Sequence, residues 1–322
     1  MKTIKLAIFF VLILSPFFWH NRLYSQEQMF NLHTEQKYNQ MLNTAVDDAA
    51  LILQQSAVWK EAEEGYESDK RLQLNKELAL QTFFRSLHLN LQIVTDPISQ
   101  LQLKNYIPVV LLLGYDGYEL YAEEQFVDTK QQVQFTHVWM PKRPYSYVDP
   151  HGNVFSFTLD DFVTVYTTTG QWIRGYQREL QLSTHIPLLQ DEKSFDAVRR
   201  TMIVNRVQED VAYRINLHNE WSKRNGVAYT FTLPTISTEE WHNSIDDVGI
   251  IAFVQGLPMG TARYNNYALG GARLIRNEYV YGTTIQGIKV AYPQACKPIV
   301  IEETFTGARE AAKQGYYPKR CK

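Results

Sequence analysis

The N-terminal residues 1–64 most constrain the fold, because they join a short apolar stretch to a segment that lacks helix breakers. Lys2 and Lys5 flank the start of the apolar stretch Leu6–Trp19, and after Pro16 the chain contains neither proline nor glycine until Gly65. Interior proline and glycine are the residues that most destabilise a helix. The sequence therefore predicts a membrane-associated segment that continues directly into one long helix.

The apolar stretch permits two interpretations. Its fourteen residues would span about 21 Å as a helix, against a hydrocarbon core of about 30 Å. That length suits a signal peptide, but a cleavable signal ends in small residues, and only Ser25 is small in the segment that follows. We therefore predict an uncleaved anchor over residues 4–24, with Lys5 and Arg22 reaching the two interfaces. A cleaved, secreted form is the alternative.

The charges around this segment predict its orientation. Lys2, Lys5 and the terminal amine outweigh Arg22, and positive flanks remain on the cytoplasmic side. The expected protein is single-pass in the cell membrane, with its N-terminus cytoplasmic and its bulk extracytoplasmic.

Residues 25–100 are predicted to form a helical stalk or hairpin. Apolar and small residues recur there at helical spacing, and a second helix is expected over residues 69–91, before Asp96-Pro97 breaks the pattern. The first helix carries a narrow, smooth stripe that permits close packing. The candidate packing residues are Leu42, Ala45, Ala49 and Ile52. The stripe could pack within the chain as a helical pair, or against copies of the protein or sister subunits.

The segment Tyr38–Leu51, placed soon after the apolar stretch, resembles the minor pilins and pilin-like proteins of tight-adherence (Tad, Flp-type) pilus systems. Those proteins carry a helix rich in alanine and aspartate after the membrane segment. The resemblance implies a long N-terminal helix packed on an antiparallel sheet, and assembly with sister subunits. The chain lacks the glutamate near the start of the apolar segment that marks major pilins, which favours a minor or accessory subunit.

Residues 101–282 are predicted to form an extracytoplasmic α+β body. Ile107–Leu113 is an apolar run followed by Asp116-Gly117, the favoured signal for a tight β-hairpin. Further strands are expected over three more ranges, and one long helix follows them. These ranges are 133–139, 154–159 and 162–167 for the strands and 191–223 for the helix. The predicted fold class is α+β, with the anchor and long helical stalk packed with an antiparallel β-rich body.

A segment rich in glycine and aromatic residues suggests a recognition loop. Four glycines surround its candidate residues, and loops of this composition often bind ligands. The candidate residues are Tyr264, Asn265, Asn266 and Tyr267. A plain connection between strands is the alternative interpretation.

Residues 283–322 are expected to form a separate small module that contains both cysteines of the chain, Cys296 and Cys321. Outside the membrane, a disulfide between them is expected. The segments Lys289–Cys296 and Phe305–Cys321, the second with the run Arg309-Glu310-Ala311-Ala312, are similar to the Ada-like cysteine module of some secreted bacterial proteins. The closing cysteine pair of that module is reduced here to Cys321. A structural zinc ion is bound by four ligands, and the two cysteines are too few, so no metal is predicted.

The sequence offers no catalytic signature. Motifs for nucleophilic hydrolases, zinc proteases, phosphate loops and dinucleotide binding are missing, so we predict no enzyme activity, no cofactor and no metal. The net charge of −2 gives no electrostatic footprint for nucleic acid.

These features together predict a membrane-anchored, non-enzymatic component of a bacterial cell-surface apparatus. It would be a pilin-like minor subunit or an accessory protein of secretion or conjugation machinery, associated with itself or with sister subunits. The alternative is a surface-binding module that recognises a glycan or a protein through the segment Tyr264–Tyr267. A hydrolase with a site assembled from dispersed residues is a third hypothesis.

Overall fold

A computed structural model describes residues 2–59, 72–224, 233–234, 236–272, 280–293, 298–305 and 308–319. The chain forms two compact units, Met1–Arg273 and Leu274–Lys322. The mixture of helices and largely antiparallel sheets confirms the predicted α+β class.

The first unit contains seven helices in the part that the structure describes. They are α1 Lys2–Ser56, α2 Lys76–Asn90, α3 Pro97–Lys104, α4 Gln177–Ser183, α5 Pro187–Gln190, α6 Glu192–Arg224 and α7 Thr238–Ser244. Its strands are β1 Val58–Trp59, β2 Leu72–Gln73, β3 Val109–Gly114, β4 Gly117–Val127, β5 Val133–Trp139, β6 Tyr145–Val148, β7 Val154–Phe157, β8 Phe162–Tyr166, β9 Trp172–Tyr176, β10 Val248–Met259 and β11 Ala262–Ala272.

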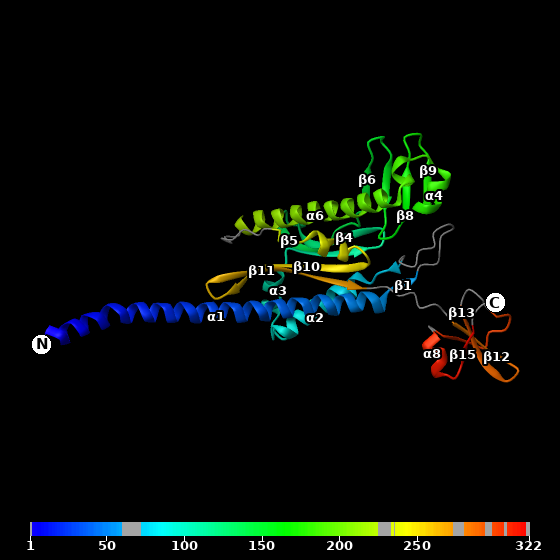
Figure 1. The fold of residues 1–322 in the computed structure, drawn as a ribbon. Helices are drawn as coiled ribbons and strands as arrows, with labels where there is room; N and C mark the ends of the chain where they lie inside the picture. The colour runs from blue at the N-terminus through cyan, green and yellow to red at the C-terminus, as the bar shows by residue number, and fades with distance from the viewer. Residues whose placement is uncertain are drawn as a thin grey trace. The chain divides into compact units, whose positions relative to one another are not determined.

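A five-stranded antiparallel sheet lies at the centre of this unit, in the order β11-β10-β3-β4-β5. Helices α1 and α2 cover one face of the sheet and α6 covers the other (Figure 1). The inner strands β3 and β10 are therefore buried on both faces. This explains why their sequences are continuous apolar runs rather than alternating patterns.

The predicted hairpin after Ile107–Leu113 is confirmed as β3–β4, but its turn differs from the expected one. Gly114 pairs with Gly117, so the two-residue loop is Tyr115-Asp116. Gly117 has a different role. A Cβ atom there would lie 2.3 Å from the carbonyl oxygen of Arg143. With any other residue at this position, β4 could not lie so close to the backbone at Arg143.

Strands β6 to β9 form a second antiparallel sheet of four strands in chain order. Its core is aromatic. The Phe157 ring lies 5.6 Å from the ring of Phe195 on α6, and Phe155 and Phe162 are fully buried. Strand β6 is not apparent from the sequence, because Tyr145–Val148 lies between prolines in a segment that resembles a turn.

The helix boundaries in the stalk region differ from the predicted ones. Helix α1 ends at Ser56, short of the predicted end near Gly65, and α2 begins only at Lys76, where the Asn75 side chain accepts a hydrogen bond from the backbone N–H of Leu78. Asp96-Pro97 does not simply end a helix. Its carboxylate accepts bonds from the first turn of α3, with proline at a favoured first position.

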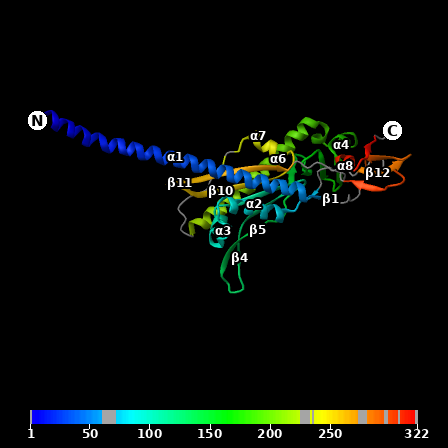
Figure 2. The ribbon, with the colours of Figure 1, turned by 90° about the horizontal axis from the view of Figure 1, so that it is seen from below.

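The long α1 helix lies along the β10–β11 hairpin and α2 (Figure 2). The predicted stalk and body are therefore not separate domains, because the C-terminal half of α1 belongs to the core of the body. It buries the side chains that share the face towards α2 and the hairpin. These are Met41, Leu42, Ala45, Val46, Ala49, Ala50 and Leu53.

The second unit has β12 Val280–Ile285, β13 Ile288–Pro293, β14 Glu303–Phe305, α8 Ala308–Lys313 and β15 Tyr317–Pro318. The four strands form one sheet in the order β14-β12-β13-β15, in which β13 and β15 are parallel. The predicted boundary at residue 283 would cut β12, which pairs with β13 over its whole length, so this unit begins earlier, at Leu274.

The core of the second unit is small. Phe305 and Tyr316 pack with their ring centroids 4.9 Å apart over Gly282. A Cβ at Gly282 would lie 2.6 Å from the Tyr316 ring, so only glycine fits there. Cys296 and Cys321 lie outside the described residues, and the disulfide between them stays a prediction.

Candidate functional site on helix α1

The N-terminal part of α1 projects beyond the body as an overhang, defined here as residues 2–26. The tip of the β10–β11 hairpin reaches α1 at Glu27, where the Thr261 hydroxyl donates a hydrogen bond to the carboxylate. Among the overhang residues whose side chains the structure describes, all are exposed except Leu14, which is half-buried.

The overhang has no polar face in its apolar stretch. Phe17, Phe18 and Trp19 follow one another and are 62%, 65% and 67% exposed. Successive helical residues point about 100° apart, so these three rings cover more than half of the helix circumference. Helices that are apolar all round are normally buried in a protein core or in a membrane. This surface is the strongest candidate for an interaction site in the first unit.

The predicted packing stripe lies in the C-terminal half of α1. Leu42, Ala45 and Ala49 are fully buried, and Ile52 is half-buried. Their partners are α2 and the β10–β11 hairpin of the same chain. Of the two interpretations of the stripe, the structure supports packing within the chain, and the buried side chains are not available to another copy.

A single glycine sets the distance between α1 and the hairpin. A Cβ at Gly270 would lie 2.7 Å from Val46 Cγ1, 2.8 Å from the Val46 carbonyl oxygen and 3.1 Å from Ala50 Cβ. The strand can thus approach the helix this closely because Gly270 has no side chain. In the sequence, Gly270 is one of the four glycines that suggested a loop, and this packing role is not apparent there.

The predicted recognition loop is not a loop. Residues 264–267 lie inside β11, paired to β10 across a hairpin whose register shifts at Gly256. The glycines that suggested a loop have other roles. Gly256 adopts a positive φ at the irregularity, and Gly270 permits close helix packing.

The four candidate residues bind within the first unit. The Tyr264 hydroxyl and the Asn266 side-chain amide both donate to Oδ1 of Asn39 on α1, each at 2.6 Å. On the other side of the strand, Asn265 Oδ1 accepts from the Gly256 N–H at 2.8 Å and the Tyr267 hydroxyl donates to Glu240 at 3.0 Å. These contacts fasten the hairpin to α1 and α7.

Burial raises the pKa of Tyr264 well above its ordinary value. The hydroxyl therefore remains protonated and serves as a hydrogen-bond donor to α1. A tyrosine held in this way is not offered to a ligand, and no contact of the segment favours the glycan-binding hypothesis.

Two histidines and a glutamate come together between the sheet and α6. His218 Nδ1 lies 3.2 Å from a carboxylate oxygen of Glu123, and its Nε2 lies 3.1 Å from the carbonyl oxygen of Asn105. His137 Nε2 lies 3.3 Å from the carbonyl oxygen of Ile107. Nothing in the local sequence signals this cluster, because His218 and Glu123 are far apart along the chain.

The cluster makes stability depend on pH. Burial lowers the pKa of His137 more than the Glu123 charge and the hydrogen bond to Ile107 raise it. The folded protein then binds fewer protons than the unfolded chain, so the free energy of unfolding should fall as the pH drops below about 6.5. Urea midpoints measured between about pH 7.5 and pH 5 should decrease, and His137→Gln should flatten that decrease.

Carboxylates with lowered pKa values affect the free energy of unfolding in a lower pH range than His137 does. Burial opposes the ionisation of Asp196, but hydrogen bonds and charge from Arg199 and Arg200 outweigh it and lower the pKa. Their contribution is lost only as the pH falls below about 4. A midpoint that stayed constant between about pH 7.5 and pH 5 would contradict the assignment to His137.

A second cluster joins the β3–β4 hairpin to α6. The Tyr118 hydroxyl donates to Asp210, which also pairs with Arg143 at 2.5 Å. Burial and the hydrogen bond to Asp210 raise the Tyr118 pKa far above its ordinary value. Tyr145, stacked on Tyr118, donates to the carbonyl oxygen of Gly114 at 2.9 Å. The space beside this cluster is too small to hold a water molecule.

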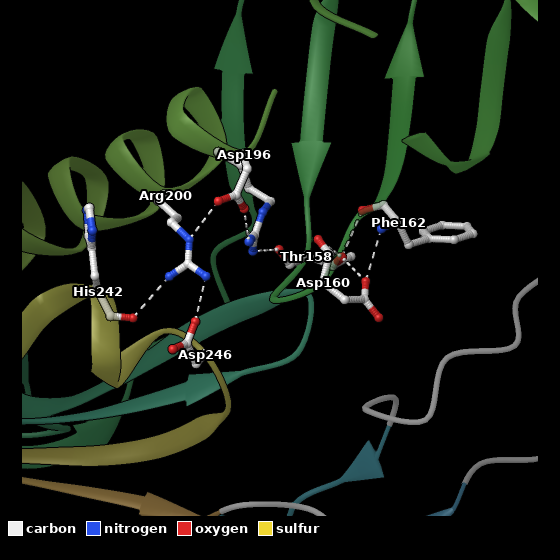
Figure 3. A network of polar contacts seen from close by, with 8 residues as sticks. Thr158, Asp160, Phe162, Asp196, Arg200, His242 and Asp246 are labelled. Carbon is white, nitrogen blue, oxygen red and sulfur yellow. Dashed lines mark hydrogen bonds and ion pairs between the residues drawn. The ribbon is translucent and has the colours of Figure 1, made fainter. Parts of the chain in front are cut away.

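A polar network connects the second sheet, α6 and α7 (Figure 3). Asp160 accepts bonds from the Thr158 hydroxyl at 2.7 Å and the Phe162 N–H at 3.0 Å, which closes the β7–β8 turn. Arg200 bridges Asp196 at 2.9 Å and Asp246 at 2.7 Å. Asp160 thus acts in a turn, and Asp196 and Asp246 act in ion pairs with Arg200.

The described residues hold no group of three or more histidines, cysteines or acidic residues placed to bind a metal ion. In the same part of the chain, no helix contains a stretch long and apolar enough to cross a membrane.

A polar pocket of about 440 Å³ is lined by Lys76 and Lys142, which pair with Glu119 and Asp116 respectively.

Comparison with known proteins adds no assignment: no protein-family model, curated protein or solved structure matches this chain.

Proposed function

We propose that this protein is a non-enzymatic, membrane-anchored subunit of a bacterial cell-surface assembly, with its body outside the membrane. It acts as a pilin-like minor subunit or as an accessory protein of secretion or conjugation machinery. The observation that carries the proposal is the α1 overhang, whose apolar side chains are exposed on every side of the helix. A surface of this kind requires an apolar environment.

Lipid suits the overhang better than a groove on one partner, because a groove covers only one face of a helix. The core Leu6–Trp19 is shorter than the hydrocarbon thickness, so Lys5 and Arg22 extend to the headgroups and the bilayer thins locally. The two N-terminal lysines favour a cytoplasmic N-terminus.

The connection between the overhang and the body supports a role in assembly. Helix α1 continues for 55 residues without interruption, and its C-terminal half is part of the core. A subunit built in this way presents its body at a fixed position relative to the membrane. Within the described body, His218 binds Glu123 and the carbonyl oxygen of Asn105, and Asp210 binds Tyr118 and Arg143. Contacts of this kind fit a structural role.

Membrane attachment can be tested with matched charge insertions. Ile13→Arg with Phe17→Arg places two charges in the apolar part of the overhang and should release the full-length protein from membranes into the alkaline-wash supernatant. Ser25→Arg with Gln28→Arg adds the same charge at exposed polar positions of α1 and should remain with the membranes. Retention of both variants, or release of both, would contradict the proposal.

Assembly is tested separately by crosslinking the full-length protein in native membranes and identifying the crosslinked partners by mass spectrometry. The proposal predicts crosslinks to further copies or to other subunits of a surface apparatus. An uncomplexed monomer would overturn the assembly role even if membrane attachment is correct.

A further inference from the structure

An apolar groove lies between α2 and α3, away from the surfaces of α1 described above. Its volume is about 680 Å³, and Tyr121 of β4 contributes to its wall. Leu80 and Phe84 are almost fully buried, whereas Leu89 is 56% and Leu101 64% exposed. Large apolar side chains that are left open at a groove indicate an unfilled contact.

The shape of the groove is suited to the packing of a third helix. The lining residues of α2 lie at positions 80, 81, 84, 85, 88 and 89, and those of α3 at positions 97, 100, 101 and 104. Both sets follow helical spacing, so each helix presents one stripe to the groove. Two such stripes form ridges between which another helix can pack.

The groove is already formed in the isolated chain. The Gln100 side-chain amide donates to the carbonyl oxygens of Ile93 at 2.9 Å and Val94 at 2.8 Å. Asp96 caps the first turn of α3 through the N–H groups of Ile98 and Ser99. The connection between the two helices is therefore held in place, and a ligand does not have to order it.

The charged residues of the groove have one sign. Arg85 and Lys104 line it, and its described lining residues include no aspartate or glutamate. The Lys104 ammonium lies 5.4 Å from the centroid of the Phe84 ring, so its charge is held at the groove. Burial and the charge of Lys104 lower the pKa of His88.

We propose that this groove binds an amphipathic helix of a partner protein, with an apolar stripe flanked by acidic residues. The lengths of α3 and α2, 8 and 15 residues, limit the contact to about two to four turns. The overhang of a second copy fits poorly, because residues 2–26 contain no acidic residue and carry Arg22. The groove lies on α2 and α3, so its binding is independent of the proposed membrane attachment of α1.

The test uses two synthetic helical peptides of about 15 residues, each with leucines at positions i, i+3, i+4 and i+7. One peptide has glutamates beside the stripe, and the other has lysines in their place. Binding to the full-length protein is measured by fluorescence anisotropy at low ionic strength, where charge contributes most. The glutamate peptide should bind about tenfold or more tightly than the lysine peptide.

Variants of the groove separate its apolar and charged contributions. Leu101→Ser should weaken the glutamate peptide about tenfold, equivalent to roughly 1.4 kcal/mol, while the control Leu182→Ser, at a position 90% exposed on α4, should change nothing. Arg85→Glu with Lys104→Glu should reverse the preference in favour of the lysine peptide. All of these positions are exposed or half-buried, and circular dichroism checks that the fold is retained.

Several outcomes would overturn the proposal. Equal affinity for both peptides, absence of binding, or binding that Leu101→Ser leaves intact would each exclude an acidic helix in this groove. A concentration-dependent dimer that Leu101→Ser dissociates would instead assign the groove to a second copy. Binding of phosphatidylglycerol vesicles, lost in the double charge variant while peptide affinity is unchanged, would assign it to a lipid surface.

Discussion

Replacement of Ala49 by glutamate is expected to destabilise the protein strongly. Ala49 has no exposed surface and lies with Leu42 and Ala45 in the interface of α1 with α2 and the β10–β11 hairpin. The longer side chain would overpack this interface and bury a carboxylate. A buried, unpaired charge costs about 3–5 kcal/mol, against a total stability of about 5–15 kcal/mol for a typical domain.

The measurement is urea unfolding followed by circular dichroism, with Leu51→Glu as the control. Leu51 lies two residues away on the same helix and is half exposed, so its replacement adds the same charge on the solvent side. We expect Leu51→Glu to change stability by less than about 1 kcal/mol. A folded Ala49→Glu variant with an unchanged midpoint would show that the stripe is not part of the core.

Gly270→Ala is expected to cost about 2–3 kcal/mol of unfolding free energy. The added methyl group would lie 2.7 Å from Val46 Cγ1 and 2.8 Å from the Val46 carbonyl oxygen, so α1 and the hairpin would have to separate. The neighbouring Gly271 provides a matched control, because a Cβ there meets nothing within 4 Å. Gly271→Ala should leave the urea midpoint nearly unchanged.

A double variant tests whether this close contact is the cause. Val46→Ala removes the methyl group that clashes but not the backbone oxygen, so Gly270→Ala with Val46→Ala should be less destabilised than the sum of the two single variants. Equal destabilisation by Gly270→Ala and Gly271→Ala would point instead to a general effect of losing glycine from the strand.

Local sequence signals predicted much of the fold. The strand Val133–Trp139 and the long helix after Asp191 lie where periodicity indicated them. Helix α7 likewise begins with a local signal, a capping box formed by Ser237 and Glu240. Each of these depends on residues close in sequence, for which spacing and capping chemistry are informative.

The errors arose where tertiary packing decides. The glycines near residues 264–267 indicated a loop, yet Gly270 is needed because α1 passes against the strand. Asp96-Pro97 looked like a helix breaker and instead begins α3. The pairing of His218 with Glu123 joins α6 to β4, and no local pattern reveals such a contact.

The continuity of α1 also has a mechanical consequence. A pull on the N-terminal end of this helix is transmitted along its axis to the interface with β10 and β11, which it loads in shear along many residues at once. Strands and helices loaded in this direction must break their contacts together, whereas a flexible linker would stretch first. Moving the intact α1 helix away from the body would therefore require removing core side chains such as Leu42 and Ala45 from their contacts.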